Sequence, residues 1–315
     1  MYFPLLRGKQ FELIALKEFA GAHPENKWIC PIIEPVRVMQ PSHIKSSLMK
    51  AAEVLSQNRI PYSIILNPER GDYAITSNRF SVADFLCMFN ELENRPIPAF
   101  FAGGKCNEVK NAIVENGLED VMVVFEDSFD IEEADELCSN KSVSYIVCAD
   151  ADSRSNLRYL MRTGKKIIRL DDKFIVRKPN TEYRGRDEDS YTEEFFYYKE
   201  DRFYGFSDYC VLPKEFSEGG GTPTAIAIHM TYRKKEDSIW VRHFVSDEAY
   251  DTQNIRNKFG SAAKHLEVFY NTVEPTAAVR WMIENRGKYP GLGVLKKVTM
   301  LNHLELISNI LSTTE

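Results

Sequence analysis

The feature that most constrains the fold of this chain is a regular alternation of short apolar runs with longer segments of helical periodicity. The runs occupy residues 3–6, 28–35, 62–66, 98–102, 121–125, 143–148 and 166–170. They are continuously apolar rather than alternating, which is typical of parallel strands buried on both faces. Strands of this kind separated by helices predict repeated βα units.

An eighth strand, predicted at residues 207–212, completes the set needed for a closed barrel. We therefore predict an α/β fold of the TIM-like (β/α)8 type; an open doubly wound sheet uses the same units and is the alternative. The 315 residues accommodate a barrel of about 250 residues with extensions. The prediction is one barrel domain over residues 1–315. Its additions are a long loop at 171–206 after strand seven, a hairpin at 222–247, and C-terminal helices at 259–315.

Composition and charge exclude several classes of protein. The net charge of -6 argues against a globally basic nucleic-acid-binding protein, although a local basic patch remains compatible with it. None of the six cysteines forms a C-x-x-C pair, as expected of free thiols in a reducing compartment. The N-terminus lacks the pattern of a signal peptide, and no window has the roughly 18 apolar residues of a membrane span. We expect a cytoplasmic protein without membrane contact.

Polar side chains follow the predicted strands, and in a barrel these positions gather on one face. Carboxylates there could hold Mg²⁺ or Mn²⁺ or divide acid and base roles, while cationic and amide groups could bind a phosphate or carboxylate. Helix capping and local ion pairs are the structural alternative. The predicted metal ligands are Glu34, Glu126 and Asp150. The predicted catalytic set is Glu34, Glu126, Asp150 and Asp171, and the predicted ligand-binding residues at these strand ends are Arg7, Lys9, Asn67 and Arg169.

Two histidines form a second candidate. His229 and His243 lie on the two strands of the predicted hairpin, which would bring them together. The stretch from His243 to Asp247 could supply a hydrogen-bonded polar cluster, whereas a histidine satisfied within the sheet is the structural alternative. The H-E-x-x-H pattern of zinc hydrolases is absent.

Residues 2–9 (YFPLLRGK) and 31–35 (PIIEP) resemble the phage-type beta protein family, and residues 205–209 and 242–247 resemble its bacterial branch. The resemblance covers most of the chain and implies a barrel. It also implies a place in phage–host conflict, with a partner protein from the same gene neighbourhood such as a small nuclease. It carries no established catalytic role. The residues that it marks are Arg7, Lys9, Glu34, Asp208, His243 and Asp247, and the last three complete the set of predicted ligand-binding residues.

These observations lead to two principal functional hypotheses. The first is a binding or regulatory component of a bacterial anti-phage defence system, which engages a partner protein, a nucleic acid or a nucleotide-like ligand. The alternative is a metal-dependent, phosphodiesterase-like hydrolase acting on a nucleotide or nucleic acid. In that enzyme the carboxylates would activate water, while Arg7 and Arg169 would stabilise phosphoryl charge. A purely structural role in an assembly is a third.

Overall fold

The structure, a computed structural model, describes residues 1–37, 47–75, 80–149, 151, 153–218, 223–247 and 253–313. Asp150, one of the predicted metal ligands, lies outside the described residues. The chain forms two compact units, each assembled from two segments. Unit 1 comprises Met1–Asp172 and Tyr197–Tyr209; unit 2 comprises Lys173–Phe196 and Cys210–Glu315.

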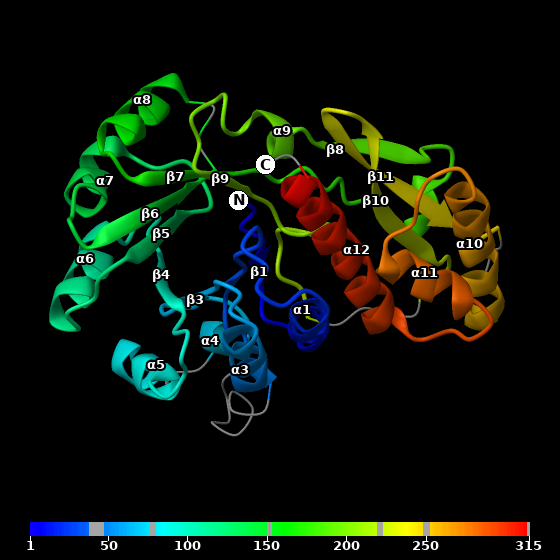
Figure 1. Ribbon diagram of the computed structural model, residues 1–315, viewed down its shortest axis with the longest axis horizontal. Coiled ribbons are helices and arrows are strands. Elements are labelled where there is room, and N and C mark those ends of the chain that lie inside the picture. The colour runs from blue at the N-terminus through cyan, green and yellow to red at the C-terminus, as the bar shows by residue number, and fades with distance from the viewer. Residues whose placement is uncertain are drawn as a thin grey trace. The chain divides into compact units, whose positions relative to one another are not determined.

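Unit 1 is a TIM-like parallel barrel, which confirms the predicted fold (Figure 1). Each strand pairs in parallel with the next one along the barrel. A parallel bridge between Tyr2 and Phe206 brings the first and last strands together, so that the sheet closes almost completely. The strands are β1 (Leu5–Leu6), β2 (Ile32–Ile33), β3 (Ser63–Ile65), β4 (Ile97–Phe101), β5 (Val121–Phe125), β6 (Val143–Cys148), β7 (Lys166–Leu170) and β9 (Gly205–Ser207).

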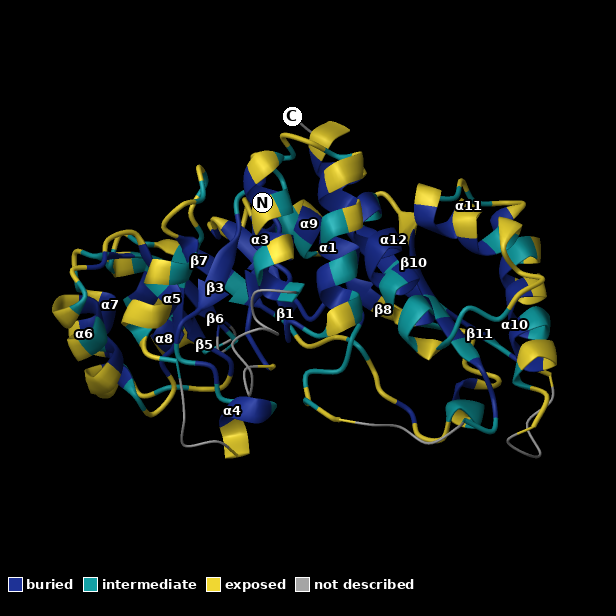
Figure 2. Ribbon diagram, turned by 90° about the horizontal axis from the view of Figure 1, so that it is seen from below, coloured by how far each residue is buried: buried dark blue, intermediate teal, exposed yellow. Residues whose placement is uncertain are grey.

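Helices surround these strands, and Figure 2 shows their buried sides toward the sheet and exposed sides outward. Local sequence sets several helix starts. At α5, for example, Ser81 accepts a hydrogen bond from the Asp84 amide while the Asp84 carboxylate accepts one from the Ser81 amide, a capping box. The helices of unit 1 are α1 (Gln10–Ala22), α3 (Met49–Gln57), α4 (Asp72–Ile75), α5 (Val82–Phe89), α6 (Cys106–Glu115), α7 (Ile131–Cys138) and α8 (Arg154–Arg162).

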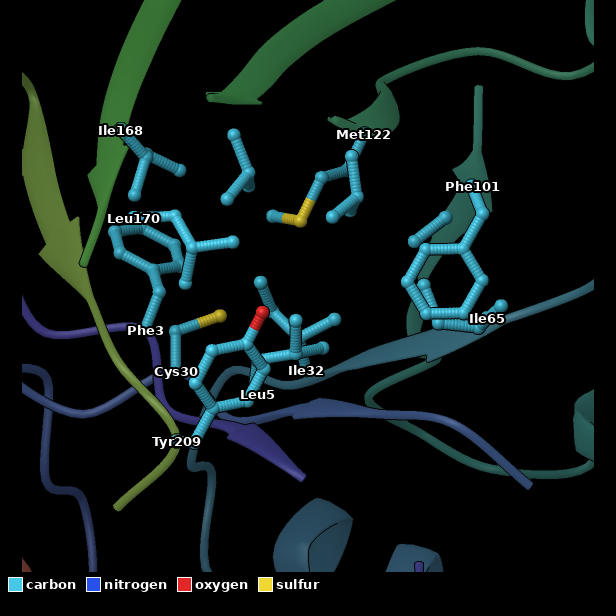
Figure 3. Packing of buried hydrophobic residues seen from close by; sticks show 13 residues of the cluster. Phe3, Leu5, Cys30, Ile32, Ile65, Phe101, Met122, Ile168, Leu170 and Tyr209 are labelled. Atoms are coloured by element: carbon cyan, nitrogen blue, oxygen red, sulfur yellow. The ribbon is translucent and has the colours of Figure 1, made fainter. Parts of the chain in front are cut away.

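The barrel interior is filled by side chains from alternate positions of the strands. Figure 3 shows residues such as Leu5, Ile32, Met122 and Ile168 pointing toward one another inside the sheet. Because successive side chains of a strand point to opposite faces, the residues between them pack outward against the helices. Both faces are therefore buried, which explains why the runs in the sequence are continuously apolar.

The predicted eighth strand was placed too far along the chain. β9 ends at Ser207, whereas the prediction began there and continued to residue 212. Cys210 and Val211 have φ values of 53° and 63°, which are incompatible with a strand, so their apolar character misled the prediction. A side chain at Gly205 would lie 2.6 Å from both the Met1 carbonyl oxygen and the Phe3 ring, so glycine permits the close approach that closes the barrel.

Within its described residues, unit 2 is a three-stranded antiparallel sheet covered by helices. The predicted hairpin is confirmed as β10 (Ala227–Lys235) and β11 (Ser238–Val245), which pair directly. The predicted long loop is not loop throughout, because it contributes the edge strand β8 (Glu188–Thr192), with η2 (Asn180–Tyr183, a 3₁₀ turn) before it and α9 (Glu194–Tyr197) after it. The polar sequence EDSYT of β8 gives no apolar strand signal.

The predicted C-terminal helices are present in unit 2 as α10 (Ile255–Tyr270), α11 (Ala277–Glu284) and α12 (Leu292–Thr313). α12 packs against β10, α10 against β11, and α11 against α12. No helix in the described ranges has both the length and the apolar character needed to cross a membrane.

Candidate functional site

Three of the predicted strand-end residues meet at the C-terminal end of the barrel. Arg7 follows β1, Glu34 follows β2 and Glu126 follows β5, and all three side chains are buried. Arg70, from the segment after β3, joins them. These four residues form what is called here the Arg–Glu ring.

Each carboxylate of the Arg–Glu ring contacts both guanidinium groups. Glu34 Oε2 accepts from Arg7 Nη1 at 3.0 Å and from Arg70 Nη1 at 3.1 Å. Glu126 accepts from Arg7 Nη2 at 2.6 Å through Oε1 and from Arg70 Nη2 at 2.7 Å through Oε2. Charge-assisted bonds of this length are among the strongest hydrogen bonds in proteins, and the alternating charges sum to zero.

Further contacts hold the ring in place. The amides of Glu69 and Arg70 donate to Glu34 Oε1 at 3.0 and 3.2 Å. The Tyr209 hydroxyl donates to Glu126 Oε1 at 3.1 Å, and the Arg7 guanidinium lies over the Tyr209 ring at 5.2 Å. Because the two amides bond to Glu34 Oε1 and the guanidinium groups bond to Oε2, both oxygens of Glu34 have hydrogen-bond partners. Both oxygens of Glu126 have partners as well.

Exposure differs sharply among the four members. The side chains of Arg7, Glu34 and Glu126 are 5%, 0% and 7% exposed, whereas that of Arg70 is 25% exposed. Burial acts to raise the pKa of Glu126, but the charges and hydrogen bonds of Arg7 and Arg70 outweigh it and hold that pKa below its usual value. Glu126 is thus a stable anion at neutral pH, and solvent reaches the ring through Arg70.

The two carboxylates of the predicted metal site that the structure describes, Glu34 and Glu126, are paired with arginines. Glu34 and Glu126 do come together, but guanidinium groups lie between them where the metal ion was expected. Within the described ranges no three His, Cys, Asp or Glu side chains are grouped so that they could hold a metal ion.

The remaining predicted strand-end residues make local contacts in unit 1. Asn67 exchanges two hydrogen bonds with the backbone of Phe101, both at 2.8 Å. Arg169 Nε donates to Asp171 Oδ2 at 2.9 Å, and Lys9 precedes the first residue of α1.

Asp208 follows β9 directly, so it too lies at the end of a barrel strand. Its Oδ1 accepts a hydrogen bond from the Tyr2 hydroxyl at 2.6 Å. This bond joins the two ends of the sheet at the point where the barrel closes.

His243 and Asp247 belong to unit 2. His243 Nδ1 lies 2.8 Å from His229 Nδ1, and its Nε2 lies 2.9 Å from Asp189 Oδ2. The hairpin register places the two histidines opposite each other, as the sequence predicted. Asp247 instead accepts from Ser261 Oγ at 2.6 Å and contacts His265 Nε2 at 2.9 Å, at an exposed position.

Sequence reasoning missed Arg70 and Tyr209. Arg70 lies five residues beyond the end of β3, and only the residues next to the strand ends were considered. Tyr209 was assigned to the eighth strand, which ends before it. An arginine in the turn N-P-E-R-G-D was the available signal for Arg70.

A comparison with models of protein families finds none that matches this chain. A comparison with curated proteins finds no significant match.

Proposed function

We propose that this protein is a binding or regulatory component of a bacterial anti-phage defence system, and that it acts with a partner protein such as a nuclease. The biological context rests on the sequence motifs that resemble the phage-type beta protein family. The preference for binding over hydrolysis rests on one observation, the saturation of both ring carboxylates by guanidinium groups.

A hydrolytic metal site needs carboxylate oxygens that are free to coordinate the ion. In the Arg–Glu ring, three of the four carboxylate oxygens accept from a guanidinium and the fourth accepts from two backbone amides. A divalent cation would have to displace buried guanidinium groups of the same sign of charge. Such a replacement is strongly disfavoured in a site screened from water.

Two members of the Arg–Glu ring come from the motifs that carry the family resemblance, which supports a functional role for the ring. Arg7 and Glu34 come from the two N-terminal motifs that carry the family resemblance, and they bond to each other at 3.0 Å. Two short motifs separated along the chain thus meet in one buried ion-pair system. Its partly exposed member, Arg70, would contact an acidic group of the partner protein, because a guanidinium pairs well with a carboxylate.

Co-purification with the neighbouring gene product tests this proposal. The full chain is expected to co-elute with that partner, and Arg70→Ala is expected to weaken binding about tenfold, or ~1.4 kcal/mol. Arg70→Lys keeps the charge and should lose less. Arg59→Ala is the matched control, because Arg59 is an exposed arginine paired with the exposed Glu25 at 3.1 Å.

Melting temperatures of the variants show whether each remains folded. Equal binding by folded Arg70→Ala and wild type would contradict the assignment of Arg70. Absence of any complex, together with metal-dependent phosphodiesterase activity of the purified chain, would contradict the proposed function and favour the hydrolase.

A further inference from the structure

The pair of histidines in unit 2 belongs to a longer chain of hydrogen bonds. Asp189 on β8 accepts from both terminal nitrogens of Arg177, at 2.5 and 2.9 Å, and its Oδ2 also contacts His243 Nε2 at 2.9 Å. His243 Nδ1 in turn lies 2.8 Å from His229 Nδ1. Asp189, His243 and His229 are called here the Asp–His–His relay.

The hydrogen bonds fix where the protons lie. The hydrogen bond from Arg177, together with that from His243, keeps the pKa of Asp189 below its usual value despite partial burial, so it is an anion that can only accept. His243 must therefore donate through Nε2, which leaves its Nδ1 as an acceptor in the neutral ring. His229 then donates through Nδ1. In this arrangement His229 Nε2 is unprotonated and carries a lone pair that can attack an electrophile.

His229 is the more exposed of the two histidines of the relay. The His243 side chain is 0% exposed, whereas His229 is partly exposed. Within the described residues, the hydrogen bond of the His229 ring is made by Nδ1, and none is made by Nε2. The Phe174 and Tyr183 rings pack against the imidazole with centroids 5.3 and 4.7 Å away, which fixes its orientation.

The segment that carries Phe174 to this imidazole is basic. Residues 173–178 have the sequence KFIVRK, with three cationic and no acidic side chains. Lys173 and Lys178 are exposed, while Arg177 compensates the charge of Asp189. The carboxylate at the inner end of the relay is thus compensated by Arg177 and does not present an unpaired negative charge.

We propose that His229 Nε2 is a nucleophile that accepts a phosphoryl group from an anionic phosphoryl donor. The other two members of the relay are positioning residues, because they act through His229. This activity belongs to unit 2 and does not depend on the function proposed for the Arg–Glu ring.

In the proposed phosphoryl transfer, every bond, electron pair and proton can be followed through the relay. With phosphoramidate as donor, the His229 Nε2 lone pair forms the N–P bond, and the P–N bond to the protonated nitrogen of the donor breaks. Ammonia leaves with that electron pair. The positive charge created on the His229 ring is relieved when its Nδ1 proton passes to His243 Nδ1. The resulting imidazolium of His243 is stabilised by Asp189 beside its Nε2.

The test is to incubate the purified full chain with potassium phosphoramidate and to map the added phosphoryl group by mass spectrometry of its peptides. We expect one acid-labile phosphoryl group on His229, and no such group at His229 in His229→Gln. His265→Gln is the matched control and should be labelled at His229 like the wild type, because His265 lies on α10 with its Nε2 on Asp247.

Positioning by Asp189 is tested by rescue. Asp189→Asn should slow labelling of His229 about tenfold, whereas Asp189→Glu, which keeps the negative charge, should restore most of the rate. Equal rates in all three proteins would overturn the role of Asp189. Wild-type protein that carries no phosphoryl group on His229, whatever happens at the other histidines, would overturn the proposal.

Discussion

For the single residues of the Arg–Glu ring, the main energetic requirement is that each buried charge has partners of opposite sign. A buried ion costs several kcal/mol of desolvation, and the mutual attraction of ion pairs repays this cost only when every charge has close partners. In the Arg–Glu ring each of the four groups has two partners of opposite sign. The ring therefore depends on all four residues being present, and the loss of any one leaves an uncompensated charge.

The sequence located part of this site. Arg7, Glu34 and Glu126 follow strands directly, and barrel geometry alone brings such residues to one face. Their mutual pairing could not be predicted, because it requires Arg70, whose position depends on the conformation of a turn. The predicted hairpin did bring together the strands of His229 and His243, but Asp189 comes from a strand without an apolar pattern.

Stability toward acid should depend on His229. Burial, followed by the effect of the neighbouring His243, lowers the pKa of His229 to about 3, while an unfolded histidine has a pKa of about 6.5. Between these values the unfolded chain binds a proton that the folded chain does not. The free energy of unfolding should therefore fall as the pH drops below about 6.5, by roughly 1.4 kcal/mol per pH unit for this group.

Urea unfolding measured between about pH 6 and about pH 5 tests this dependence, with His229→Gln for comparison. Tryptophan fluorescence follows both units, through Trp28 in unit 1 and through Trp240 and Trp281 in unit 2. The variant should lose less stability than the wild type over this interval. An identical loss in both proteins would show that His229 is not held in its neutral form by the fold.

At the scale of elements, strands with two buried faces were predictable, including the short strands β1, β2 and β3, whereas the polar strand β8 was not. β5, β6 and β7 match their predicted ranges because each is a continuous apolar run. β8 was missed because its sequence is polar, and β9 was misplaced because the apolar residues after it have positive φ. Hydrophobic pattern thus specifies burial, whereas backbone conformation decides where a strand ends.

The turn after β1 should tolerate no side chain at Gly8. Its φ is 57°, and an added Cβ would lie 2.6 Å from the Glu34 carbonyl oxygen. We expect Gly8→Ala to lower the free energy of unfolding by about 2 kcal/mol, from backbone strain and the displacement of Glu34. Gly103→Ala is the matched control, since a Cβ there meets no atom of the described residues within 4 Å, and it should change stability by less than about 0.5 kcal/mol.

Chemical denaturation of the two variants and the wild type measures this difference. If Gly8→Ala were as stable as Gly103→Ala, the backbone of Glu34 would not be confined as the structure describes. The position of Glu34 in the Arg–Glu ring would then need revision.

At the scale of the whole molecule, each unit is built from two separate segments of the chain. The chain leaves the barrel after β7, adds β8 to the sheet of unit 2, returns for β9 and then completes unit 2. A fragment beginning at Cys210 would therefore lack β8 and leave β11 without its second neighbour. The two candidate sites, the Arg–Glu ring and the Asp–His–His relay, lie in different units.

Arginine neutralises the carboxylates at the C-terminal end of the barrel, and we propose that they serve a binding site rather than a metal centre. The melting temperature of the wild type and of Glu34→Gln, measured with and without Mg²⁺ or Mn²⁺, tests it most directly. A ligand that binds the native state raises its melting temperature. We predict that the two proteins respond alike to either cation. A metal-dependent rise in the wild type that Glu34→Gln abolishes would show that Glu34 binds a metal ion, contrary to this proposal.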